Sequence, residues 1–342
     1  MAAGTSDIRT QILAGAADVD AGRADVRPVL RALGVTGLLA DDDGEADGGL
    51  LAAVRMVRRI AAGSLAAAFA VWSQRMVLEY LRSCPPSADV RALQDALRSG
   101  EVTGATALAP AIADLAGRGE LPVVAEPDGD GWLLSGCVSW ASNLFDDAVV
   151  VTPARTPQEG RVVVSFRLTD DGVAPRPAPE LLGLNGTGTR SLELHRVAVP
   201  RAAVLSDDLA GFMSLCRPPM LLMQAALAVG LADAALDASG AHLTGVNSAL
   251  RRDHEDLARR RDDVVIAMED QAGSLTGAGR AQLARTRLDA IAVATAAVAL
   301  ETAVCGGTGY RADSPTARRV REAAFLPVQA PTLGQLRHDA AG

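Results

Sequence analysis

The side chains that most often bind metals or act as nucleophiles are few in this chain and lie far apart. The chain has four cysteines and four histidines in 342 residues. None of the cysteines has the CxxC spacing of a zinc site or a redox motif; they stand at Cys84, Cys137, Cys216 and Cys305. We therefore predict no metal site and no disulfide framework.

The segment 251–261 concentrates arginines among acidic residues, which allows two interpretations. Arginine pairs well with phosphate, so the segment could bind a phosphorylated ligand. A solvated helix face has the same composition, and Asp256 and Arg260 have the i,i+4 spacing of a surface ion pair. We favour the solvated face, because such helix surfaces are common.

The composition is that of a globular protein with a large core. Hydrophobic residues make up 49% of the chain and charged residues 22%. The net charge of −8 argues against nucleic acid as the main partner, because phosphate backbones need a basic surface, so we expect no nucleic-acid partner. The first residues lack the pattern of a signal peptide, which predicts a cytoplasmic protein. The most apolar run, 219–236, contains Gln224 and Asp233, which favours a buried helix over a membrane span.

The hydrophobic pattern changes twice along the chain. Helical periodicity extends to about residue 100 and returns near 209, and short apolar runs with turn signals such as PDGDG (127–131) lie between. We predict a mainly α protein with a central β-domain. It comprises an N-terminal helical domain (1–101), an antiparallel β-barrel or sandwich (102–207) and a C-terminal four-helix bundle (208–342). A polar, glycine-rich loop is expected at 41–49, and long helices at 213–239, 248–275 and 279–305.

Four segments, in order, resemble the acyl-CoA dehydrogenase superfamily over roughly residues 25–335. They are LRALGVTGLLADDDGEADGG, GDGWLLSGCVSWASNLFDDAVVV (129–151), GTGTRSLELHRVAVP (186–200) and AVCGGTGYRADSPTARRVREA (303–323). The resemblance implies that family's fold, with FAD in the cleft between the β-domain and the C-terminal helices. It also implies that residues 129–143 and 303–332 converge on this one cleft.

The resemblance assigns five residues to the cofactor. Trp140 and Ser142 match positions that flank the isoalloxazine ring, where an indole offers a flat apolar surface and a hydroxyl could donate toward N5. Gly306 and Gly307 match the turn that contacts the dinucleotide, and Thr332 matches a threonine of the C-terminal loop. Purely structural roles are the alternatives: a core Trp140, a strand-end Ser142, a glycine helix cap and a surface Thr332.

The sequence departs from the family where a base should remove the substrate α-proton. The two family locations of the catalytic glutamate hold Ala330 and Met220, and neither side chain can accept a proton. The family's T-E-P reads Leu108-Ala109-Pro110, the glutamine before the double glycine is Ala303, and 242–250 lack the arginine that meets the pyrophosphate. Glu255 or Glu301 would have to supply a base.

Three functions remain open at this point. The first is a flavin-dependent oxidoreductase of the acyl-CoA dehydrogenase type, acting on a small-molecule substrate such as an acyl-CoA. The second is a flavin monooxygenase on the same fold, which needs no α-proton base. The third is a non-catalytic subunit that forms a hetero-oligomer with a catalytic paralogue. The apolar helices 213–239 and 279–305 predict a homodimer or homotetramer for the first.

Overall fold

The protein is described by a computed structural model that covers residues 2–40, 49–274 and 279–341. The predicted loop at 41–49 lies outside the described residues except for Gly49. The described residues of the N-terminal part form five helices: α1 (Ala2–Asp20), α2 (Arg27–Val35), α3 (Leu50–Ala61), α4 (Leu65–Arg82) and α5 (Ala88–Ser99).

Helix α4 is buried along almost its whole length and ties the N-terminal helices to the sheet. Its N-cap Ser64 accepts a hydrogen bond from the backbone N–H of Ala67 at 3.2 Å, which satisfies one of the free amides of the first turn. The Gln74 amide donates to the carbonyl oxygen of Leu97 and accepts from the N–H of Gly104 at 2.6 Å. Because buried amides need partners, Gln74 fixes how α4 meets α5 and the first strand.

The central domain is one sheet of eight strands, mostly antiparallel. The strands are β1 (Gly104–Thr106), β2 (Val123–Asp128), β3 (Gly131–Ala141), β4 (Val149–Arg155), β5 (Arg161–Arg167), β6 (Val173–Pro175), β7 (Arg190–Val199) and β8 (Val204–Ser206). Their order is β6-β7-β3-β2-β4-β5-β8, and β1 pairs with β4. The predicted turn joins β2 to β3, with Gly129 at a φ of 61°. Two pairings, β1 with β4 and β2 with β4, are parallel, which the antiparallel prediction did not include.

Between β1 and β2 lies a short helix that we did not predict, α6 (Ala109–Leu115). Pro110 stands in its first turn, where the missing N–H costs nothing. Short 3-10 helices occupy Pro157–Glu159, Asn185–Thr187, Arg201–Ala203 and Gly245–Leu250.

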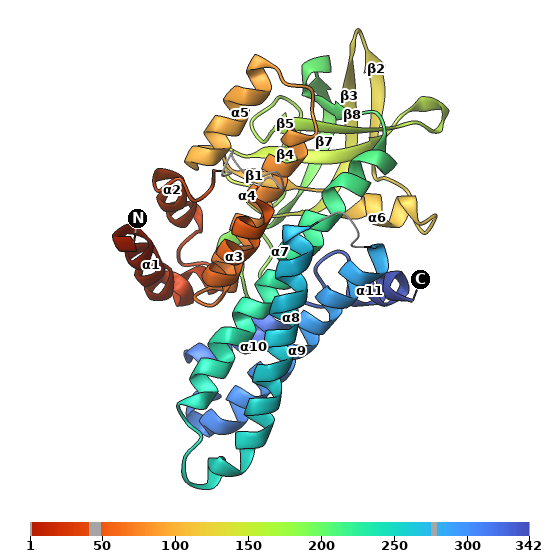
Figure 1. Ribbon diagram of the computed structural model, residues 1–342. Helices are drawn as coiled ribbons and strands as arrows, with labels where there is room; N and C mark the ends of the chain where they lie inside the picture. The colour runs from red at the N-terminus through yellow and green to blue at the C-terminus, as the bar shows by residue number, and fades with distance from the viewer. Residues whose placement is uncertain (1, 41–48, 275–278, 342) are drawn as a thin grey trace.

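The C-terminal part contains α7 (Leu209–Gly240), α8 (Arg251–Gly273), α9 (Arg280–Gly309), α10 (Pro315–Phe325) and α11 (Leu333–Ala340). The three long helices match the predicted ranges closely. Figure 1 shows them running as a bundle away from the sheet, which sits at one end of the molecule. The prediction of a mainly α protein with a central β-domain and a C-terminal bundle is confirmed.

Two separate hydrophobic cores hold these parts together. One lies inside the β-domain and includes Val123, Leu134 and Val164. The other is continuous from α1 through α4 to α7 and α9, so the N-terminal and C-terminal helices share one core. The predicted boundary at 101 falls between α5 and β1, and the one at 207 between β8 and α7. The division into three domains stays a prediction.

Within the described residues, two helices, α7 and α9, are long and apolar enough to cross a membrane by length and composition. In α7, however, 89% of the most apolar window is buried inside the protein. Helix α7 is therefore accounted for as the central core helix, as the sequence predicted.

The basic segment 251–261 forms part of α8, and two of its arginines, Arg259 and Arg261, pair with acidic residues. Asp256 pairs with Arg259, one residue before the predicted partner Arg260. Arg261 pairs with Asp233 of α7, which also accepts from Arg58 of α3 at 2.7 Å. These ion pairs support the interpretation as a helix face.

Candidate functional site

Trp140 lies near the end of β3, and 60% of its surface is exposed. The pairing of β3 with β7 shifts register between Val138 and Ala141, so the regular alternation of side chains is interrupted at Trp140. The alternative interpretation of Trp140 as a core residue is therefore wrong. An exposed indole is a flat apolar surface that the rest of the chain leaves uncovered.

Ser142 follows Trp140 and belongs to a chain of three hydroxyls. Its oxygen lies 2.6 Å from the Thr189 hydroxyl, which lies 2.8 Å from that of Thr187, and Thr187 donates to the carbonyl oxygen of Leu184. A hydroxyl has one hydrogen to donate, so Thr189 must donate to Thr187, and Ser142 to Thr189. In this arrangement Ser142 has lone pairs free to accept, whereas the sequence prediction made it a donor.

Asn143 fixes the backbone that carries both residues. Its amide nitrogen donates to the carbonyl oxygens of Ala70 in α4 at 2.9 Å and of Gly104 in β1 at 3.1 Å. Its φ of 62° is a conformation that asparagine tolerates better than most residues. The end of β3 is thus held rigidly against α4.

The loop 329–332, where the family resemblance places a base at Ala330, is held by two side chains that sequence reasoning missed. Arg287 of α9 donates to the carbonyl oxygens of Pro331 at 3.0 Å and Gln329 at 3.1 Å. Gln224 of α7 donates to that of Ala330 at 2.9 Å. Three successive carbonyls therefore point toward buried donors, and burial lowers the pKa of Arg287 to about 9.

Unused hydrogen-bonding atoms surround this loop. Among the described residues, the buried Nε of Arg287, Oε1 of Gln224 and Nε2 of Gln329 have no hydrogen-bond partner. The polarity of Gln224 was visible in the sequence as an interruption of an apolar run. The contact of Gln224 with the Ala330 carbonyl could not be predicted from the sequence.

Thr332 is exposed and caps α11. It forms a capping box with Gln335, whose side chain accepts from the N–H of Thr332 at 2.7 Å. This gives Thr332 a structural role of its own. Contact of Thr332 with a cofactor stays a prediction.

Gly306 and Gly307 lie in an exposed break within α9. Gly306 has a φ of 54° and a ψ of −143°, a conformation that other residues rarely adopt. Apart from the adjoining residues and the local helix backbone, no atom lies within 4 Å of where a Cβ would stand on either glycine, so this side of the backbone is open to a neighbouring molecule.

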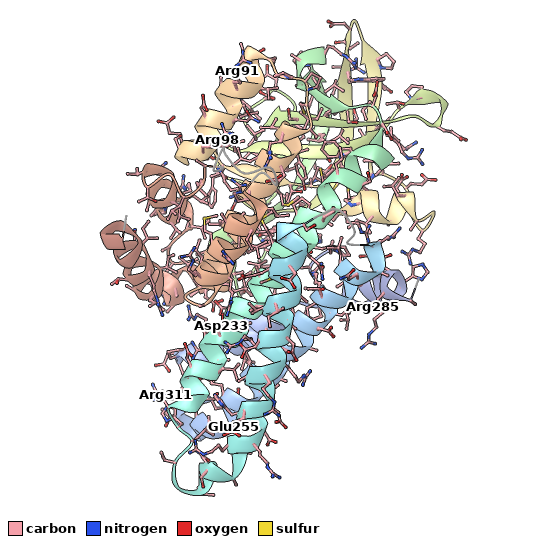
Figure 2. All side chains as sticks on the ribbon, viewed as in Figure 1. Arg91, Arg98, Asp233, Glu255, Arg285 and Arg311 are labelled. Atoms are coloured by element: carbon pink, nitrogen blue, oxygen red, sulfur yellow. The ribbon has the colours of Figure 1, made fainter. Side chains whose placement is uncertain are left out.

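This turn does not meet Trp140 within one chain. Figure 2 shows Arg311, which follows the turn, at the end of the bundle away from the sheet. The predicted convergence of residues 129–143 and 303–332 on one cleft is therefore wrong for the Gly306 turn. The helical bundle separates the two ends, a separation that motif order cannot reveal.

The two carboxylates considered as replacement bases lie in the same distant region. Glu301 is fully buried and accepts from Thr316 at 2.6 Å and from Arg319 at 2.7 Å. Glu255 is exposed on α8, and Figure 2 places it near Arg311. Met220 is buried in α7. Neither glutamate lies at the Trp140 end of the same chain.

The curated proteins reported below, which resemble this chain in sequence, are acyl-CoA dehydrogenases. No protein-family model matches the chain. The probable acyl-CoA dehydrogenase FadE25 of Mycobacterium tuberculosis is 25% identical over 60% of this chain and 57% of its own length. The mitochondrial short-chain specific acyl-CoA dehydrogenase of Bos taurus is 26% identical over 61% and 55%. The chain thus spans a little over half the length of these relatives.

Solved structures of acyl-CoA dehydrogenases superpose on nearly the whole chain. A glutaryl-coenzyme A dehydrogenase in complex with glutaryl-CoA superposes with a TM-score of 0.86 at 22% identity, covering 99% of this chain and 93% of that one. Butyryl-CoA dehydrogenase from Megasphaera elsdenii gives 0.86 at 17% identity, covering 98% and 94%. The fold is that of the acyl-CoA dehydrogenases.

The sequence relatives and the fold indicate the same class of protein. The curated relatives and the solved structures of the same fold are both acyl-CoA dehydrogenases, the superfamily that the four motifs resemble.

Proposed function

We propose that the protein is a flavin-dependent oxidoreductase of the acyl-CoA dehydrogenase type that binds FAD and acts on an acyl thioester. The exposed face of Trp140 carries this proposal, because an uncovered indole beside a rigid strand end suits a flavin ring. Trp140 would form the apolar wall, and Ser142 would present its free lone pairs to the ring edge. Bound FAD supplies the acceptor for a hydride.

The cofactor site would need two chains. Arg311, beside the open Gly306 turn, lies at the end of the bundle away from the sheet that carries Trp140, so we propose that a dinucleotide contacting both would lie between two molecules. We therefore propose a homodimer or homotetramer in which the turn of one copy meets the β-domain of another. Light scattering tests this, and a monomeric mass for the flavin-loaded protein would contradict it. The cytoplasmic location stays a prediction.

A second candidate is a non-catalytic subunit of a mixed oligomer. It is favoured by the absence of a proton acceptor at Ala330 and Met220 and by the engagement of Glu301 in a buried ion pair. A chain of this kind would bind flavin only together with a catalytic paralogue.

Spectroscopy of the purified protein separates these functions. Visible flavin absorbance that an acyl-CoA bleaches supports the proposal. Flavin that is reduced only by an external supply and then consumes oxygen supports the monooxygenase alternative, and colourless protein supports the non-catalytic subunit.

The site itself is tested by substitution. Trp140→Ala should weaken flavin binding about fivefold or more, and so lower flavin content at limiting flavin, because stacking on an indole contributes on the order of 1 kcal/mol or more. Leu182→Ala is the matched control, since Leu182 is also a large exposed apolar side chain. Equal flavin content in both variants would refute the assignment of Trp140.

A further inference from the structure

The hydroxyl chain that begins at Ser142 has only one possible direction. It comprises three short contacts: Ser142 with Thr189, Thr189 with Thr187, and Thr187 with the carbonyl oxygen of Leu184. Each contact needs one hydrogen between its two oxygens, and the three hydroxyls carry three hydrogens. The carbonyl at the end has no hydrogen to give. All three hydrogens therefore point toward Leu184, and the Ser142 oxygen keeps none for a ligand.

The fold fixes the buried end of this chain. Thr187 is completely buried in the 3-10 helix Asn185–Thr187, and its carbonyl oxygen accepts from the N–H of Asn143 at 2.8 Å. The N–H of Leu184 donates to the Asp20 carboxylate at 3.0 Å, which holds the neighbouring carbonyl in place. Turning the Thr187 hydroxyl away from Leu184 would cost a buried hydrogen bond. The direction of the chain is therefore a property of the folded protein.

This direction decides which form of a flavin Ser142 suits. With its hydrogen bound to Thr189, the Ser142 oxygen can only accept a further hydrogen bond. N5 of an oxidised flavin ring has a lone pair and no hydrogen, whereas N5 of the reduced ring carries an N–H. An acceptor beside N5 therefore forms a hydrogen bond with the reduced ring and leaves N5 of the oxidised ring without a donor.

We propose that Thr189 and Thr187 are positioning residues that make Ser142 an acceptor, so that the site binds reduced flavin in preference to oxidised flavin. This preference rests on the proposed function, in which Ser142 lies beside the ring. Hydrogen bonds to the ring nitrogens of a cofactor tune its electronics. Tighter binding of the reduced form raises the midpoint potential of the bound flavin, and about 30 mV corresponds to a tenfold preference in a two-electron couple.

The midpoint potential of the flavin-loaded, full-length protein tests the proposal, measured by spectroscopic titration against a reference dye. Thr189→Val removes the acceptor of the Ser142 hydrogen, which frees Ser142 to donate to N5 of the oxidised ring. The potential should fall by about 30 mV, which is a tenfold loss of the preference for reduced flavin. Thr189→Ser keeps a hydroxyl and should retain the wild-type potential.

Two further variants separate this effect from a general disturbance. Thr187→Val frees the chain at its buried end and should shift the potential in the same direction, which gives a second test if Thr189→Val does not fold. Thr295→Val is the matched control, because Thr295 is an exposed residue of α9 whose hydroxyl donates to the carbonyl oxygen of Ile291 at 2.9 Å. The control should leave the potential unchanged.

The double variant Ser142→Ala/Thr189→Val shows whether Thr189 acts through Ser142. In the Ser142→Ala background, Thr189→Val should not alter the potential, because no Ser142 hydroxyl remains to be reversed. A flavin-loaded Thr189→Val protein with the wild-type potential, or an equal fall with and without Ser142, would overturn this proposal while leaving the proposed function intact. A wild-type protein that takes up no flavin would contradict the proposed function, and this preference with it.

Discussion

The buried carboxyl of Glu322 should make the stability of the protein depend on pH. Glu322 lies in α10 with 1% of its surface exposed, and its Oε1 accepts from the backbone N–H of Leu65 at 3.1 Å. Burial raises its pKa from 4.5 to about 7, although Arg318 at 3.9 Å and the Leu65 N–H act in the opposite direction. The folded protein therefore holds this proton at pH values where the unfolded chain has lost it.

The sign and size follow from proton linkage. Because the folded-state pKa is the higher one, the stabilising contribution is complete below pH 4.5 and is lost as pH rises through about 7. A shift of roughly 2.5 pKa units corresponds to about 3 kcal/mol of unfolding free energy. Glu322→Gln keeps the acceptor for Leu65 and removes the titration. Relative to this variant, the wild type should lose about 2 to 3 kcal/mol between roughly pH 5 and pH 8.

Urea unfolding at these two pH values measures the difference directly. Glu180→Gln is the matched control, because Glu180 is exposed and should not alter the pH dependence. If wild type and Glu322→Gln lose stability in parallel between the two pH values, the buried carboxyl is not the titrating group.

Two further predictions concern close packing and backbone geometry. Gly230→Ala should destabilise the protein by about 2 kcal/mol or more in thermal unfolding, because a Cβ there would stand 2.2 Å from the carbonyl oxygen of Arg58 in α3. Gly273→Ala, in α8 with nothing within 4 Å, should be neutral or slightly stabilising, and equal losses in the two variants would contradict a tight α3–α7 contact. Asn143→Ala should cost about 2 to 4 kcal/mol in urea unfolding, because two buried hydrogen bonds, to the carbonyl oxygens of Ala70 and Gly104, are lost and alanine is strained at a φ of 62°. A loss below about 0.5 kcal/mol would show that Asn143 does not hold the strand end.

The Gly306 turn and the loop 329–332 show why matching motifs do not by themselves make a site. Both belong to the C-terminal segments that resemble the family, and only about twenty residues separate them. The bends of the chain around α10 nevertheless carry the turn to the far end of the bundle, while the loop is held between α7 and α9. Under the proposed function, a flavin that contacts both Trp140 and Gly306 would be shared between two chains, whereas the loop 329–332 is held within one chain.

Local patterns along the sequence were enough to predict the order of the elements and the family. Periodicity located α7, α8 and α9 to within a few residues, and PDGDG located the β2–β3 turn, because these features depend on near neighbours. Pro110 could also have indicated α6 by its position in a first turn.

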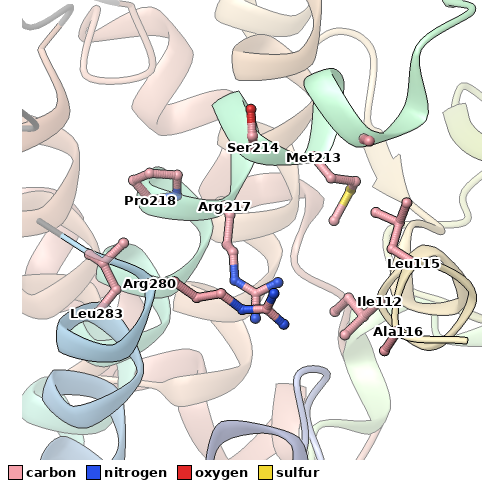
Figure 3. Close-up of a pocket in the computed structure, with 10 residues that line it drawn as sticks. Ile112, Leu115, Ala116, Met213, Ser214, Arg217, Pro218, Arg280 and Leu283 are labelled. Carbon is pink, nitrogen blue, oxygen red and sulfur yellow. The ribbon is translucent and has the colours of Figure 1, made fainter. Parts of the chain in front are cut away.

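Only the tertiary structure decided which side chains meet. The exposure of Trp140 depends on a register shift between β3 and β7, and the three carbonyls of loop 329–331 are bound by Arg287 and Gln224. Asp339 of α11 pairs with both Arg217 and Arg280, the two arginines that lie side by side in Figure 3. In the side-chain hydrogen bonds among these contacts, the two partners lie between 42 and 122 residues apart in the sequence. Such contacts are set by the packing of whole elements, and no local pattern of residues encodes them.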